Sequence, residues 1–183
     1  MKTFLIVVVV STIFAQTPER AVSQVFPVDL EDLTKYKDKW LDPESMDGYN
    51  GAVYDIEEGE IVFKGHLRSG QLHGRYEEYH SRGFERGSYQ EGKREGTFEV
   101  YSVKGKLSEK GIYQNGVRNG LYFAYHDNMR VWIKTEYAKG SWEGPYESFD
   151  ATGNLISRGH YKANFQCGSW TQKGKVVEYP PCE

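Results

Sequence analysis

The sequence has little of what marks several common classes of protein. Its 183 residues include only two cysteines and six prolines, and only 38% are hydrophobic, so a thick two-layer core is not expected. The formal net charge is −3, which gives no basic surface, and we therefore exclude nucleic acid as the main partner. The most apolar run, from Phe4 to Phe14, is shorter than the roughly 20 residues of a membrane-spanning helix.

Motifs of catalysis, metal binding and cofactor binding are also missing. The five histidines are His66, His73, His80, His126 and His160. Those at equivalent repeat positions, such as His80 and His126, would be spread along a sheet, whereas a zinc site needs three or four ligands that converge. Adjacent carboxylates such as Glu77 and Glu78 would point to opposite faces of a strand and could not cooperate as acid and base. The sequence therefore predicts a protein that is not an enzyme, with no metal and no cofactor.

Glycine and aromatic residues are abundant and recur at a fixed interval. There are 20 glycines and 14 tyrosines, and 15% of all residues are aromatic. Glycine pairs four residues apart occur at Gly70 and Gly74, Gly92 and Gly96, Gly116 and Gly120, and Gly140 and Gly144. Their first members are separated by 22, 24 and 24 residues, and a tyrosine closes each unit at Tyr89, Tyr113, Tyr137 and Tyr161. A period of this size indicates a repeat architecture in which each unit stacks on its neighbours.

Two aromatic residues, three positions apart, follow each glycine pair. They are Tyr76 and Tyr79, Phe98 and Tyr101, Tyr122 and Tyr125, and Tyr146 and Phe149, with Trp170 starting a fifth copy. On a strand this spacing points the two rings to opposite faces unless a bulge intervenes. The glycine two positions before the closing tyrosine, such as Gly111, is expected to let a neighbouring ring lie flat across it.

The predicted fold class is all-β: an elongated single-layer antiparallel meander of repeated β-hairpins, with about ten to twelve strands. Turn dipeptides such as Asn115-Gly116 join the hairpins. Four segments are expected: residues 1–15 as a signal peptide, 16–45 as a linker and lead-in, 46–174 as the repeat domain and 175–183 as a C-terminal cap. Within the lead-in, Leu30, Leu33, Trp40 and Leu41 fit a short helix only loosely, so its structure stays open.

The start of the chain predicts export. One lysine followed by the apolar run reads as a signal peptide, with a retained N-terminal anchor as the alternative, and places the protein in the periplasm or outside the cell. In an oxidising compartment Cys167 and Cys182 are expected to form a disulfide. We expect this bridge to fasten the C-terminal tail over the end of the sheet, where an edge strand exposes unpaired backbone groups.

The pattern G-x-x-x-G-x-Y-x-x-Y-x-x-x-G, followed by a strand that ends in G-x-Y-x-x-G, resembles the MORN repeat over roughly residues 47–174. Its form of 22 to 24 residues is similar to the MORN variant of bacterial proteins classed as YwqK-like antitoxins. Met129, Thr135 and Asn164 stand where the pattern has glycine. The resemblance implies a single-layer, elongated sheet that acts as a binding or scaffolding module.

The aromatic rows give the candidate binding residues. A meander without a covering layer leaves a face open, and an exposed aromatic strip usually marks a binding site. The candidates are Tyr76, Tyr79, Phe98, Tyr101, Tyr122, Tyr125, Tyr146 and Phe149. We expect a protein partner, with a toxin bound by an antitoxin or immunity protein, or a cell-wall glycan or lipid headgroup, as alternatives. Charge does not indicate contact with an anionic membrane.

Overall fold

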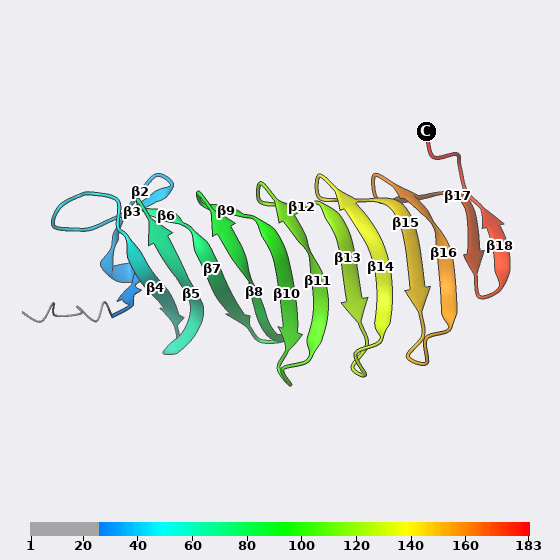
Figure 1. Ribbon diagram of the computed structural model, residues 1–183, viewed down its shortest axis with the longest axis horizontal. Helices are drawn as coiled ribbons and strands as arrows, with labels where there is room; N and C mark the ends of the chain where they lie inside the picture. Colours follow the sequence, from blue (N-terminus) through cyan, green and yellow to red (C-terminus); the bar gives the residue numbers. More distant parts are fainter. Residues whose placement is uncertain (1–25) are drawn as a thin grey trace, which may run out of the picture.

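The computed structural model describes residues 26–183, which form a single elongated sheet (Figure 1). The sheet has 16 strands, and a separate two-stranded hairpin lies in the chain between its first strand, β1 (Val28–Asp29), and its second, β4 (Gly51–Glu57). The only helical element among the described residues is the 3-10 turn η1 (Leu30–Asp32). The predicted all-β meander of hairpins is therefore confirmed. In this part of the chain no helix has the length and apolar character needed to cross a membrane.

The long strands follow one another across the sheet, and each pairs antiparallel with the next. They are β4 (Gly51–Glu57), β5 (Glu60–Arg68), β7 (Gly74–His80), β8 (Gly83–Gln90), β10 (Gly96–Ser102), β11 (Leu107–Gln114), β13 (Gly120–Tyr125), β14 (Val131–Ala138), β15 (Ser141–Phe149), β16 (Leu155–Lys162) and β17 (Phe165–Gln172). The outermost strands are β1 (Val28–Asp29), which pairs parallel with β4, and β18 (Lys175–Glu178).

The sheet has more strands than the ten to twelve that the sequence predicts. Part of the difference comes from the short strands β6 (Gln71–Leu72), β9 (Lys93–Arg94) and β12 (Val117–Arg118). Each ends two residues before the second glycine of a pair, which begins the following long strand; these glycines, Gly74, Gly96 and Gly120, adopt φ values of 81°, 77° and 102°. Such left-handed backbone interrupts the ladder as a bulge does. The edge strands β1 and β18 account for the rest.

The first glycine of each pair lies in a two-residue turn between units. In the turns Glu91-Gly92, Asn115-Gly116 and Lys139-Gly140, the first residue has φ between 49° and 51° and the glycine between 78° and 88°. Two successive positive φ values define the type I′ turn, whose twist matches that of the strands it joins. Asn164 takes the glycine position of the last such turn with φ 71°, because asparagine tolerates this conformation.

Successive turns are hydrogen-bonded to one another, which holds the units in register. The amide of Gly116 donates to the carbonyl of Arg94 at 2.9 Å, and that of Gly140 donates to the carbonyl of Arg118 at 2.8 Å. The side chain of Glu95 accepts from the amide of Asn115 at 2.8 Å. The same contacts recur along the chain at Gly92 with Leu72, Asn164 with Trp142, Lys139 with Asn119, and Ala163 with Glu143.

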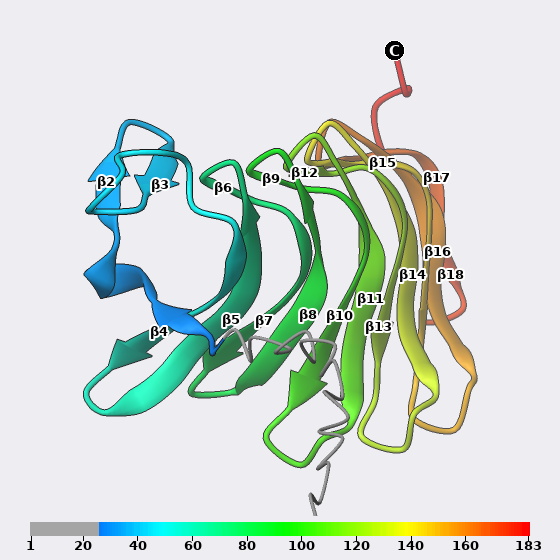
Figure 2. The same ribbon diagram turned by 60° about the vertical axis from the view of Figure 1, so that its left-hand side comes forward.

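The sheet curves, and its two faces differ. Figure 2 shows the strands bending around the side on which η1, β2 (Thr34–Tyr36) and β3 (Lys39–Leu41) lie. We call this side the inner face and the opposite side the outer face. The lead-in, whose structure the sequence left open, forms η1 and the β2–β3 hairpin and packs its buried Leu33 on Val53 and Leu67. It therefore covers the inner face at the first hairpin.

The predicted disulfide between Cys167 and Cys182 is present, with Cα atoms 5.0 Å apart. The tail, however, does not lie over the end of the sheet. It continues β18 alongside β17, because Tyr179 donates to the carbonyl of Gly168 at 2.9 Å and Gly168 donates to the carbonyl of Pro180 at 2.8 Å. The bridge thus fastens the edge strand itself. A disulfide is typical of oxidising compartments; the predicted signal peptide, residues 1–15, lies outside the described residues.

Candidate binding surfaces

The first aromatic of each unit lies on the inner face, and Tyr76, Phe98 and Trp170 each pack across a glycine. Tyr76, Phe98 and Trp170 are only 3%, 1% and 1% exposed. A Cβ atom on the glycine beneath would come within 2.9 Å of Tyr76 at Gly87, 2.6 Å of Phe98 at Gly111 and 2.1 Å of Trp170 at Gly159. The prediction that these glycines let a neighbouring ring lie flat across the strand is confirmed. They replace a second layer in burying the aromatic core.

Thr135 stands at the position of these glycines in the third unit and alters the packing there. Its side chain is 1% exposed, between Tyr122 and Tyr146 on the neighbouring strands, and its hydroxyl donates to the carbonyl of Pro145 at 3.2 Å. The ring of Tyr122 meets that of Tyr137 edge-on, with an interplanar angle of 78°. A small β-branched residue therefore fills the space that glycine leaves in the other units.

Two arginines lie across the inner rings, and sequence reasoning missed them. The guanidinium of Arg94 is 5.3 Å from the ring centre of Tyr76 and 5.4 Å from that of Tyr113. Arg118 lies 4.9 Å from the ring centre of Phe98. At these distances an arginine is attracted to the face of a ring. An alignment of the repeats could have revealed them, because the position two residues after the first glycine is large in every copy but differs in type. It holds Leu72, Arg94, Arg118, Trp142 and Gln166.

Carboxylates hold the first of these arginines. Arg94 forms ion pairs with Glu78 and with Glu85, whose carboxylate oxygen lies 3.2 Å away, and Tyr76 donates a hydrogen bond to Glu85. Burial and the contact with Glu85 raise the pKa of Tyr76, so its hydroxyl remains a donor. Glu77 and Glu78 do face opposite sides of the sheet, as predicted. Glu78, however, lies directly opposite Glu85 on the neighbouring strand β8. Each carboxylate has a partner, which gives the group a structural role.

Toward the C-terminal end of the inner face, several aromatic rings pack on one another, and neither Arg94 nor Arg118 lies over them. The ring of Trp142 lies 4.8 Å from that of Tyr161 and 5.6 Å from that of Tyr146, centre to centre. Tyr146 and Tyr161 also contact Trp170, at 5.5 and 5.2 Å. Trp142, Tyr146 and Tyr161 are only partly buried. We call Trp142, Tyr146, Tyr161 and Trp170 the inner cluster.

The outer face carries a ladder of charges that crosses the sheet. Successive strands from β5 to β16 place one outward residue each in this row, and every one except Phe123 is charged. In order they are Lys64, Glu77, Arg86, Glu99, Lys110, Phe123, Lys134, Glu147 and Arg158. Glu99 is the best-held member, since it pairs with Arg86 at 2.7 Å and with Lys110 at 3.1 Å. The hydrogen bond from Arg86 is the main reason why the pKa of Glu99 falls to about 2.

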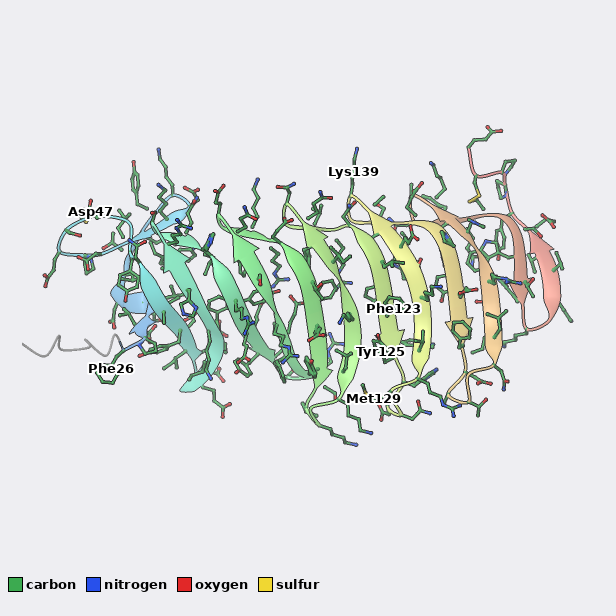
Figure 3. All side chains as sticks on the ribbon, viewed as in Figure 1. Phe26, Asp47, Phe123, Tyr125, Met129 and Lys139 are labelled. Atoms are coloured by element: carbon green, nitrogen blue, oxygen red, sulfur yellow. A yellow bond between two sulfur atoms is a disulfide. The ribbon has the colours of Figure 1, made fainter. Side chains whose placement is uncertain are left out.

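Phe123 interrupts this ladder and belongs to an apolar patch. Figure 3 labels Phe123 and Tyr125, which lie along β13 near the middle of the sheet. Leu121 on the same strand, Ile112 on β11 and Trp132 on β14 are 44%, 40% and 47% exposed. We call Ile112, Leu121, Phe123, Tyr125 and Trp132 the outer patch. Lys110 and Lys134 are the cross-strand neighbours of Phe123 on either side.

The predicted binding residues thus divide between the two faces. Tyr76, Phe98, Tyr122 and Tyr146 lie on the inner face, where the first three are buried. Tyr79, Tyr101, Tyr125 and Phe149 lie on the outer face and are partly exposed. Within the units the aromatics three residues apart therefore point to opposite sides, even where a bulge shifts the register beside Tyr101, Tyr125 and Phe149. The candidate binding residues therefore form two rows, one on each face of the sheet, rather than a single aromatic strip.

Residues 26–183 contain no group of three or more His, Cys, Asp or Glu side chains that could hold a metal ion. In the comparisons with known proteins, no family model and no curated protein sequence matches the chain. The long single sheet of consecutive hairpins is compatible with a repeat β-protein. The more specific resemblance to MORN-variant proteins remains one of sequence pattern.

Proposed function

We propose that this chain is an exported, non-enzymatic scaffold that binds a protein through the outer patch. The observation that carries the proposal is the interruption of the charge ladder. The equivalent outward position holds Glu77 in β7, Glu99 in β10 and Glu147 in β15, but Phe123 in β13. An apolar side chain that replaces a glutamate on an open face leaves apolar area in contact with water, and such patches commonly mark interaction sites.

The neighbours of Phe123 strengthen this proposal and indicate the partner's chemistry. The position two residues earlier holds Arg75, Thr97 and Pro145 in the other units, but Leu121 in β13. The side chains of Lys110 and Lys134 beside the patch are 45% and 50% exposed. An apolar centre with a charged rim is the usual composition of a protein interface. The partner should therefore present an apolar or aromatic anchor bordered by carboxylates.

Export is supported by the apolar start of the chain and by the Cys167–Cys182 disulfide. An antitoxin or immunity role would be a special case of the same function, with a toxin as the protein bound by the outer patch. The partner's identity would distinguish the two.

Photo-crosslinking followed by a binding measurement tests the proposal. A photoreactive residue at position 121 should capture a partner from an extract of the source cells, whereas the same residue at the equivalent position 75 should not. With that partner purified, Phe123→Glu should weaken binding at least tenfold. This variant makes the ladder continuous and places a carboxylate between two lysines, so its thermal stability should be unchanged.

His66→Glu is the matched control, because it adds a carboxylate to the exposed outer face of β5, which β7, β8 and β10 separate from the patch. It should leave the affinity for the partner within a factor of two. If Phe123→Glu binds the partner as tightly as the original chain, the outer patch is not the interface and the proposal is wrong.

A further inference from the structure

The inner cluster differs from the rest of the inner face in what lies above its rings. In the second and third units, Arg94 and Arg118 cover the rings. In the fourth unit the equivalent residue is Trp142, which adds a ring instead of covering one. Among the described residues, no lysine or arginine lies over a ring of the inner cluster. Trp142, Tyr146 and Tyr161 are partly exposed, so part of their aromatic surface is available to a ligand.

The surroundings of the cluster are polar but uncharged. Within the described chain, no Asp, Glu, Lys or Arg occupies an inward-facing position of β14 to β17. The inward polar groups are hydroxyls and amides: Ser148 and Ser157 hydrogen-bond to each other at 2.8 Å, and Gln172 donates to the hydroxyl of Tyr179 at 3.3 Å. By contrast, the inner face of β7 to β11 carries Glu78, Glu85 and Glu109.

We propose that the inner cluster binds a neutral oligosaccharide, with sugar rings lying on Trp142, Tyr146 and Tyr161. The faces of sugar rings are largely C–H surface and pack well on aromatic faces, while their hydroxyls need partners that both donate and accept. Serine, glutamine and tyrosine side chains provide both functions. Ligand sites typically combine aromatic walls with a few polar groups of this kind.

The absence of charge decides among ligand classes. An anionic glycan or a lipid phosphate would call for arginine or lysine, which the inner face offers at Arg94 and Arg118 but not here. A proline-rich peptide would also lie on aromatic rings. Its proline residues, however, lack the N–H that could pair with the acceptor oxygens of Ser157 and Gln172, whereas a sugar hydroxyl supplies that donor.

Titration of the purified full chain with uncharged hexasaccharides tests this inference. The probes are cello-, malto-, xylo- and chito-hexaose, followed by calorimetry and by tryptophan fluorescence, with decaproline and a polygalacturonate oligomer alongside. At least one neutral hexasaccharide should bind and change the fluorescence. Trp142→Arg, which recreates the arginine of the two preceding units, should weaken that binding at least tenfold and keep the fold.

Trp132→Ala is the matched control, because it removes an exposed tryptophan from the opposite face. It should leave sugar binding unchanged while it weakens binding of the protein partner. The two measurements therefore test this inference and the proposed function independently of each other. The inference is overturned if none of the neutral sugars binds. It is also overturned if decaproline or polygalacturonate binds more tightly than every neutral sugar, or if Trp142→Arg leaves sugar binding intact.

Discussion

At the scale of single residues, glycine and the ring above it act as one structural unit. Gly87, Gly111 and Gly159 have ordinary backbone angles, so the space they leave, rather than their conformational freedom, explains their place. The rings above them bury their surface without a second layer of structure. Removing either member should therefore affect stability more than its size suggests.

We expect Gly111→Ala to lower the free energy of unfolding by about 2 kcal/mol, the usual cost of inserting a methyl group into a packed core. The new Cβ would lie 2.6 Å from the ring of Phe98, which must move. Urea denaturation measures the change. Thr97→Ala on the outer face is the control and should change stability by less than about 0.5 kcal/mol. In a Phe98→Leu background the cost of Gly111→Ala should shrink; an equal cost in both backgrounds would contradict the glycine–ring unit.

The pH dependence of stability should reflect Glu99. Its folded-state pKa of about 2 lies below the ordinary value of 4.5, so it stabilises the fold above pH 4.5 and loses this effect as the pH falls toward 2. Glu99→Gln should therefore lower Tm at pH 6, and the gap to the original chain should close by pH 2. Thermal unfolding at four pH values between 2 and 6 measures this. Glu58→Gln, in the β4–β5 turn, controls for the change in net charge; a gap that stays constant with pH would contradict the assignment.

Which residues could be predicted from the sequence depends on how far their contacts reach. Strand alternation alone places Glu77 and Glu78 on opposite faces, and the structure agrees. Arg94 could not be placed in the same way, because its carboxylate partners come from β7 and β8, and the pairing register decides which side chains meet. The division of the candidate binding residues between two faces could be predicted from alternation; the outer patch could not, since exposure depends on all its neighbours.

At the scale of elements, turn chemistry was the most informative part of the sequence. Asn115-Gly116 predicts a type I′ turn and forms one. Met129 shows how the fold overrides a local preference: with φ 67° it takes the turn position that glycine holds at Gly105 and Gly153. The lead-in was not predictable, because its apolar residues follow neither period and are fixed by packing on Val53 and Leu67.

The C-terminal edge should depend on the disulfide. Replacing both Cys167 and Cys182 with serine should release the tail and β18, because the chain-entropy model gives about 3 kcal/mol for a loop of this length. Hydrogen exchange at the amides of Gly168 and Tyr179 should become fast, while β4 to β8 stay protected. Thiol titration of the unreduced, unfolded original chain should find no free thiol. Protection at Gly168 that survives the double substitution would mean that packing alone holds the edge.

At the scale of the whole molecule, the fold is a one-dimensional array. From β4 to β18 each long strand pairs with the long strands next to it in the sequence, and the turn hydrogen bonds link each unit only to the next. Stability is then close to a sum of unit and interface contributions. The two faces can also change independently, since alternation separates them: Phe123 alters the outer ladder in the third unit, and Trp142 alters the inner face in the fourth.

A one-unit deletion tests this modularity together with both binding proposals. Removing residues 115–138 joins Gln114 to the turn at Lys139-Gly140. The amide of Lys139 then reaches Glu95, and that of Gly140 reaches the carbonyl of Arg94, in place of Asn115 and Gly116. We expect a folded β-protein with a lower Tm, because one unit and one interface are lost. The measurements are circular dichroism, thermal unfolding and binding.

The deletion removes Leu121, Phe123, Tyr125 and Trp132 but keeps the inner cluster whole. The shortened chain should therefore lose the protein partner and keep the neutral sugar. A deletion of residues 115–126, half a unit long, is the control and should fail to fold as an array, since it removes β12 and β13 and places the β13–β14 turn directly after β11, where the turn between units belongs. If both deletions unfold, the units are not interchangeable, and long-range coupling along the sheet must contribute to stability beyond the neighbour contacts seen here.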